Sequence, residues 1–95
     1  MTGTTRSSEG LDARRRRLLY RSWHRGTREM DLIMGRFADA AIGSLSESEL
    51  DAFERLSEEP EPDLYAWITG ERPVPTEHDT GLFRKLRAFA RDGRT

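Results

Sequence analysis

Residues 17–41, RLLYRSWHRGTREMDLIMGRFADAA, decide the fold class, because they hold two helical patterns that a glycine separates. In the first pattern, a mostly apolar set of residues recurs at spacings that place its members on one face of a helix. These residues are Leu11, Leu18, Leu19, Ser22 and Trp23. Gly26 is expected to end this helix, because glycine readily takes the positive φ that often follows a helix. The sequence therefore predicts a first helix from Leu11 to this break.

The second helix is expected directly after the break. Thr27 is placed to cap it, and Glu29 and Asp31 lie in its first turn, where the helix dipole favours negative charge. Apolar residues then repeat at intervals of three and four, which indicates a face directed to the core. They are Met30, Ile33, Met34, Phe37, Ala38 and Ala41. The pattern ends near Gly43.

The third helix has the clearest start signal in the chain. Ser46 and Glu49 form a capping box pattern, and Leu45 and Leu50 flank it at the two positions of a hydrophobic staple. We expect Leu50, Phe53 and Leu56 to face the core, and Glu47, Asp51, Glu54, Glu58 and Glu59 to face solvent. The helix is expected to end before residues 59–63, EPEPD, because a proline disfavours helical geometry in the residue before it.

Two shorter patterns complete the chain. Pro62 and Asp63 are placed to open a fourth helix that Gly70 closes, and residues 71–79 read as a connector. A fifth helix is expected from about Asp79, with Gly93 beyond its end. Its apolar side consists of Leu82, Phe83, Leu86, Phe89 and Ala90. Because no segment alternates with period two, the sequence predicts an all-α protein, a single small bundle of five short helices.

Length and composition limit the possible classes of protein. Ninety-five residues supply one modest core, so we expect a flexible tail over residues 1–10 and one helical domain over residues 11–93. The absence of cysteine excludes disulfides and thiolate sites. No apolar run approaches the roughly 20 residues that span a bilayer, and the amino-terminal stretch lacks the apolar segment of a secretion signal. We therefore expect a cytoplasmic protein that does not bind membranes.

Groups for catalysis or metal binding are sparse. The two histidines, His24 and His78, lie far apart in the sequence and have no partner at metal-ligand spacing. His24 is expected to contact the last carbonyls of the first helix. No pairing of a nucleophile with a base is recognisable, and no glycine-rich phosphate loop occurs. We therefore expect neither an enzyme nor a metal site.

Charge is distributed unevenly along the chain. Residues 1–45 hold nine arginines and five acidic residues, whereas residues 46–95 hold seven basic and twelve acidic ones. Arg14–Arg17 could neutralise successive phosphates of a nucleic acid, or could form a solvated helix face. The net charge of −1 favours the solvated face, so we expect no nucleic-acid partner. A small arginine-rich nucleic-acid-binding or regulatory protein is the alternative function.

The residues around the break allow two interpretations. Gly26 is a helix cap, Glu29 a partner of the helix dipole, and Arg25 either solvated or paired with Glu29. The same residues would offer a bare backbone, a donor fork and an acceptor to a surface that docks there. Local chemistry alone leaves both interpretations open.

A set of motifs resembles a known family. Arg25-Gly26-Thr27-Arg28-Glu29 has the form Arg-Gly-x-x-Glu, Asp31 follows, residues 63–67 read Asp-Leu-Tyr-x-Trp, and Arg72-Pro73 comes next. In this order, over residues 14–90, the chain resembles the SdhE family of flavinylation factors. Members of that family assist covalent attachment of FAD to the flavoprotein subunit of succinate dehydrogenase. Position 27 is Thr where the family often has Met.

The resemblance implies a five-helix assembly factor that is not itself an oxidoreductase. Its expected partner is the flavoprotein subunit of succinate dehydrogenase or fumarate reductase, and the FAD on which it acts is bound to that partner. The factor would hold no cofactor of its own and would be a monomer when free. The resemblance implies that this turn faces the partner. The predicted contact residues are therefore Arg25, Gly26, Arg28, Glu29 and Asp31.

Overall fold

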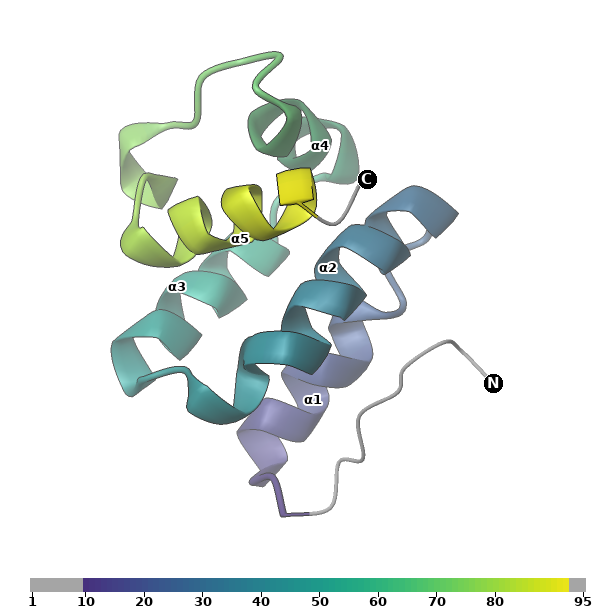
Figure 1. Ribbon diagram of the computed structural model, residues 1–95, viewed down its shortest axis with the longest axis vertical. Helices are drawn as coiled ribbons and strands as arrows, with labels where there is room; N and C mark the ends of the chain where they lie inside the picture. Colours follow the sequence, from purple (N-terminus) through teal and green to yellow (C-terminus); the bar gives the residue numbers. More distant parts are fainter. Residues whose placement is uncertain (1–9, 93–95) are drawn as a thin grey trace. The chain divides into compact units, whose positions relative to one another are not determined.

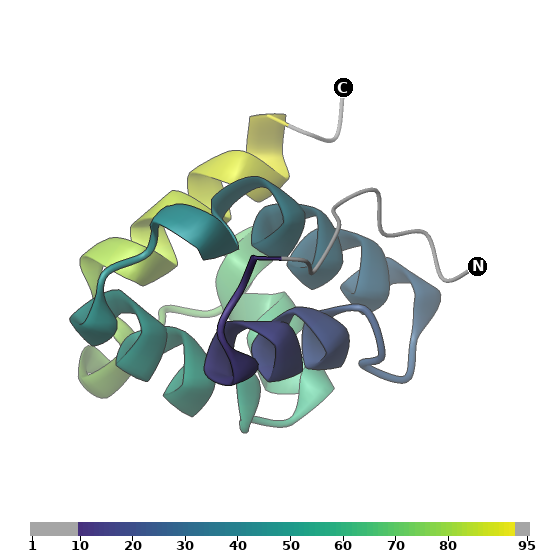
Figure 2. The same ribbon diagram turned by 90° about the horizontal axis from the view of Figure 1, so that it is seen from below.

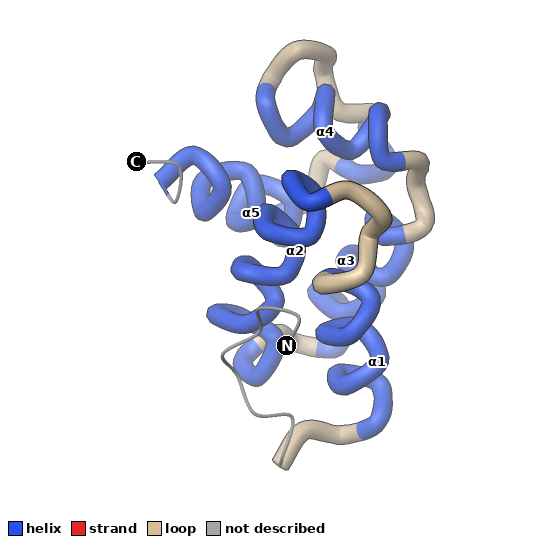
Figure 3. Tube along the Cα trace, turned by 90° about the vertical axis from the view of Figure 1, so that its right-hand side faces the viewer, coloured by secondary structure: helices blue, strands red, loops and turns tan. Residues whose placement is uncertain are grey.

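The structure, a computed structural model, describes residues 10–92, which form five α-helices, two 3-10 helices and no strand (Figures 1 and 3). The elements are α1 (Ala13–Ser22), α2 (Arg28–Ala41), η1 (Ile42–Ser44), α3 (Glu47–Ser57), α4 (Glu61–Thr69), η2 (Thr76–His78) and α5 (Gly81–Asp92). The predicted all-α class with five α-helices is confirmed. The predicted tail lies outside the described residues except for Gly10, and so does Gly93.

The contacts between residues group the chain into two compact units, residues 1–45 and residues 46–95. Each contains its own set of buried apolar side chains. The expected single domain over residues 11–93 stays a prediction. None of the described helices combines the length and the hydropathy that crossing a bilayer requires.

In the first unit, α1 and α2 lie side by side and run in opposite directions (Figures 1 and 2). The buried side chains are Leu18, Leu19, Ser22, Trp23, Met30, Met34, Phe37, Ala38, Ile42 and Leu45. These include most of the residues that periodicity assigned to the core. Leu11, Ile33 and Ala41 are only half-buried. The helical pattern therefore located the contact face of each helix.

The predicted limits of α1 are wrong. The helix begins at Ala13, so Leu11 lies outside it, and it ends at Ser22 with Trp23 as its C-cap. Gly26 does have a positive φ of 108°, but it lies in the turn that follows. The helix ends earlier because the amides of Trp23 and His24 donate to carbonyls of residues 19–21 and close its last turn before the glycine.

The end of α2 is held by an arginine whose role the sequence did not reveal. Arg15 on α1 donates from Nε to the Ile42 carbonyl at 2.9 Å and from Nη2 to the Leu45 carbonyl at 2.6 Å. Both acceptors belong to η1 or directly follow it, beyond the last residue of α2. Arg15 therefore joins the start of α1 to the end of the α2–η1 segment.

In the second unit, α3 begins as predicted. The Ser46 side chain accepts from the Glu49 amide at 3.2 Å, and Glu49 Oε1 accepts from the Ser46 amide at 2.9 Å. Leu50, Phe53 and Leu56 are buried as expected. Of the residues expected outward, Glu47, Asp51 and Glu58 are exposed, and Glu54 and Glu59 are half-buried. The capping box therefore located the start of α3, and the spacing of its apolar residues located its buried face.

Helices α4 and α5 lie against each other in this unit, and α5 also contacts α3. Gly70 closes α4 with a φ of 84°, as predicted. The expected start of α5 at Asp79 is wrong, because Thr76–His78 form η2 and α5 begins at Gly81. The hydroxyl of Thr80 accepts from the Phe83 amide at 3.1 Å and supplies the cap.

Candidate functional site

The turn between α1 and α2 is shaped by Gly26. This residue is exposed, and a Cβ built on it would meet no atom within 4 Å. The glycine is therefore needed for its positive φ and not to make room for a neighbour inside the protein. As a result, the turn presents bare backbone to the surroundings.

Asp31 fixes this turn from the first turn of α2. Its Oδ1 accepts from the backbone amide of Arg25 at 2.5 Å, and both residues are half-buried. Thr27 caps the same helix by accepting from the Met30 amide at 3.2 Å. The predicted contact residue Asp31 therefore has a clear internal role, which is to hold the backbone next to Gly26.

The other predicted contact residues surround this backbone. Arg28 and Glu29 are exposed in the first turn of α2, while Arg25 is half-buried directly before the glycine. The structure thus brings all five predicted residues to one corner, which we name the Arg-Gly turn (Arg25, Gly26, Arg28, Glu29 and Asp31). This corner combines guanidinium donors, a carboxylate acceptor and uncovered backbone, a combination suited to a polar protein surface.

The Arg-Gly turn rests on a close packing of Trp23 against α2. A Cβ at Gly35 would lie 2.3 to 2.6 Å from three ring atoms of Trp23, so only glycine lets the indole approach this closely. The indole Nε1 also lies 3.4 Å from Asp39 Oδ1. Sequence reasoning missed this role of Gly35. The signal was a glycine inside a helical pattern, which often marks a close approach.

Tyr20 and His24 form an aromatic pair that leads into the Arg-Gly turn. Their rings are stacked with centroids 3.9 Å apart, and His24 Nδ1 donates to the Tyr20 carbonyl at 2.7 Å. The expected contact of His24 with a late carbonyl of α1 is confirmed. Tyr20 is 64% exposed, the one large hydrophobic side chain so exposed within residues 10–92. Sequence analysis did not single it out.

The arginines of Arg14–Arg17 are not a uniform set of free charges. Arg15 binds the carbonyls of Ile42 and Leu45, and Arg16 donates to the Leu11 carbonyl at 2.5 Å. A guanidinium held by backbone carbonyls is less available to a phosphate. This arrangement favours the structural interpretation of the cluster over a nucleic-acid surface.

One group of side chains in the described part of the chain has donor atoms close enough to hold a metal ion. It consists of Glu59, Glu77 and His78, whose ligand atoms lie within 4.8 Å of one another. His78 is buried, and its Nε2 lies 2.7 Å from Glu59 Oε2, the distance of a hydrogen bond. Because this pair ties η2 to the segment that follows α3, it has a structural explanation without a metal. Sequence reasoning missed it, since the partners are 19 positions apart.

Comparison with known proteins gives consistent matches. A family model described as "Flavinator of succinate dehydrogenase" matches residues 16–90, which include the Arg-Gly turn. The chain is 39% identical over 80 residues to the FAD assembly factor SdhE of Acetobacter pasteurianus, covering 84% of this chain and 73% of that protein.

Two fungal proteins named "Succinate dehydrogenase assembly factor 2, mitochondrial" are also similar. The protein of Debaryomyces hansenii is 42% identical over 84 residues, or 85% of this chain and 59% of that protein. The protein of Mycosarcoma maydis is 40% identical over 70 residues, or 74% of this chain and 29% of that protein. The chain therefore spans most of the bacterial relative but a smaller share of the fungal ones.

Proposed function

This chain belongs to the family of flavinators of succinate dehydrogenase, and we propose that it is an assembly factor of that enzyme. It binds the flavoprotein subunit and promotes covalent attachment of FAD to it. The observation that carries the proposal is the family match over residues 16–90, within which the Arg-Gly turn is a preformed polar corner. The flavoprotein subunit of fumarate reductase is a second client under the same proposal.

The factor acts by positioning and not by chemistry of its own. The FAD and the residue that becomes bonded to it belong to the partner, so the factor contributes no nucleophile and is not an enzyme. A protein that binds the reactive geometry of its partner increases the population of that geometry. The rate of covalent flavin attachment rises as a result. It works as a monomer in the cytoplasm and holds no cofactor when free.

Each residue of the Arg-Gly turn has a defined task in this proposal. The Arg25 guanidinium donates to a carboxylate or carbonyl of the partner, and Glu29 orients it or accepts from the partner. Gly26 allows the partner to approach the backbone closely, while Asp31 keeps that backbone in place through the Arg25 amide. Arg28, exposed beside Glu29, adds a further donor at the rim.

Gly26→Arg is expected to abolish covalent flavin attachment while leaving the protein folded. The new side chain would point into open space but would stand where the partner docks, and its strain at positive φ costs about 1 kcal/mol. The measurement is in-gel flavin fluorescence of the flavoprotein subunit in a strain that lacks the native factor.

Gly70→Arg is the matched control. Gly70 also has a positive φ, 84°, and open space around its Cβ position, so an arginine there carries the same backbone strain in the other unit. It should support normal flavin attachment. A folded Gly26→Arg protein that restores full fluorescence would show that the turn is not the docking site.

The alternative, a nucleic-acid-binding protein that works through Arg14–Arg17, receives less support. Arg15 and Arg16 already donate to backbone carbonyls, which removes two guanidinium groups from such a surface. The alternative would regain support if duplex DNA or RNA bound with an affinity that fell steeply with salt.

A further inference from the structure

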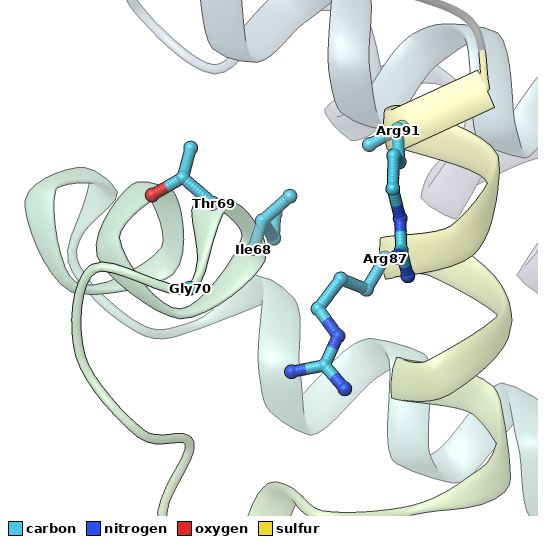
Figure 4. Close-up of a pocket in the computed structure, with 6 residues that line it drawn as sticks. Ile68, Thr69, Gly70, Arg87 and Arg91 are labelled. Atoms are coloured by element: carbon cyan, nitrogen blue, oxygen red, sulfur yellow. The ribbon is translucent and has the colours of Figure 1, made fainter.

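A pocket of about 310 Å³ lies in the second unit, between the end of α4 and the last turns of α5 (Figure 4). It is lined by Ile68, Thr69, Gly70, Arg87, Ala90 and Arg91. Figure 4 shows the side chains of Arg87 and Arg91 on the α5 wall, opposite Ile68 and Thr69. The volume is at the lower end of the range of small-ligand pockets. The lining thus combines two cationic groups with a small apolar surface.

The two arginines differ from the cations that precede them on α5. Arg84 and Lys85 each form an ion pair with a carboxylate, at 3.2 and 2.6 Å. Arg87 and Arg91 have no carboxylate partner within residues 10–92. They stand one helical turn apart, so their like charges repel each other across the same face of α5. An anion between them would remove this repulsion.

Capping of α4 does not account for these guanidinium groups. The carbonyls of residues 65–67 near its C-terminus already accept hydrogen bonds from the unit itself. The Gly70 amide donates at 3.3 Å, the Arg72 amide at 3.1 Å and the Thr69 hydroxyl at 2.9 Å. These three acceptors are satisfied without α5, and neither Arg87 nor Arg91 donates to another carbonyl of α4 within residues 10–92.

The position of Arg87 also suits a ligand. Its Cζ lies 5.5 Å from the centroid of the Phe83 ring, a cation–π arrangement. Such a contact with the guanidinium restrains the side chain but leaves its N–H groups able to donate. Arg91 is exposed, so it can reach an anion at the pocket entrance.

We propose that this pocket binds an oxyanion, a carboxylate or a phosphate group, through the guanidinium groups of Arg87 and Arg91. Ile68 and Ala90 contact the apolar part of the ligand next to that group. A planar donor fork matches the oxygens of either anion. The site is independent of the proposed assembly function, because no residue of the Arg-Gly turn takes part in it.

The test is a titration of the full chain with inorganic phosphate and, separately, with butyrate, at constant ionic strength. Amide chemical shifts in ¹⁵N-labelled protein should change in a saturable way, and the changes should be concentrated at residues 68–70 and 87–91. Formate serves as a carboxylate without an apolar stem. It should bind more weakly than butyrate, by about fourfold for each methylene that butyrate buries. If the chemical shifts change in a saturable way with only one of the two anions, that anion identifies which oxyanion the site binds.

The variants decide whether the pocket is responsible. Arg87→Gln combined with Arg91→Gln should abolish the saturable shifts, and Arg91→Gln alone, at an exposed position, should weaken binding by about tenfold. Arg84→Gln removes a charge from the same helix outside the pocket and should bind as the native chain does. The proposal is overturned if neither anion gives saturable shifts, or if the double variant binds as tightly as the native chain. The same spectra report whether each variant is folded.

Discussion

Gly26 and Gly35 are both required, but for opposite physical reasons. At Gly26 there is open space around the Cβ position, and the constraint is the backbone φ of 108°. At Gly35 the φ is ordinary for a helix, and the constraint is the indole of Trp23, which occupies the space of a side chain. The first glycine shapes the Arg-Gly turn, and the second lets Trp23, which lies shortly before that turn, pack against α2.

Gly35→Ala should destabilise the protein by about 1–3 kcal/mol, although alanine is the better helix former. The added methyl group would lie 2.3 to 2.6 Å from ring atoms of the buried Trp23, so the indole or α2 must shift. Urea unfolding measures the change.

Gly81→Ala is the control for Gly35→Ala, since a Cβ at Gly81 meets no atom within 4 Å. It should leave the free energy of unfolding unchanged or raise it slightly. Equal stability of the two variants would mean that the close approach of Trp23 to α2 is not a constraint on the fold.

At the scale of elements, side chains from one segment hold the ends of another. Arg15 on α1 binds carbonyls at and after η1, and Lys85 on α5 binds the Glu49 carboxylate, which also completes the capping box of α3. These contacts join residues 27 to 36 positions apart, so no local pattern predicts them. The starts of α2 and α3 were more accessible to prediction, because the cap side chain and the backbone amide that donates to it lie within one turn.

Arg15→Met should lower the free energy of unfolding by about 1–3 kcal/mol, because it leaves the Ile42 and Leu45 carbonyls without this half-buried donor. Arg17→Met, at an exposed neighbouring position, is the matched control and should change stability little. Chemical denaturation measures the free energy of unfolding of both variants. A similar loss in both would indicate a general effect of helix charge instead of the two hydrogen bonds.

The Glu49 carboxylate makes stability depend on pH. Its hydrogen bond from Lys85, together with that from the Ser46 amide, lowers its pKa below the ordinary value of 4.5. A lowered folded-state pKa adds stability above the unfolded pKa, and this stability is lost as pH falls through the folded pKa.

Glu49→Gln should therefore be less stable than the native chain at neutral pH, and the difference should shrink as the pH falls below about 4.5. Unfolding curves recorded from pH 7 to pH 3 follow this difference. Glu58→Gln, exposed at the end of the same helix, serves as the control and should show no such convergence. A constant difference at every pH would mean that ionisation of Glu49 does not contribute to the stability of the native chain.

At the scale of the whole molecule, the chain consists of two helical units of similar length, residues 1–45 and 46–95. Units of this length lie close to the size below which an apolar core alone usually does not stabilise a fold. This is the physical reason to keep the prediction of one domain over residues 11–93.

Each unit contains one tryptophan, Trp23 in the first and Trp67 in the second. Trp67→Phe leaves a reporter in the first unit, and Trp23→Phe leaves one in the second. If the units form one domain, the fluorescence transition of each variant should coincide with the loss of total helix measured by circular dichroism. A fluorescence midpoint separated from the helix transition in either variant would show two independently unfolding units.

Local sequence patterns were sufficient to predict the all-α class, the five α-helices and the break at Gly26. Periodicity, caps and short motifs act over a few residues, so they can be read without knowledge of the fold. Four arrangements became visible only in the folded chain: Asp31 holds the Arg25 amide, Gly35 admits Trp23, Arg15 reaches Ile42, and Arg87 and Arg91 line one pocket. The physical reason is that these arrangements depend on how far apart two segments lie and which rotamer each side chain takes. Both are set by packing and not by local sequence.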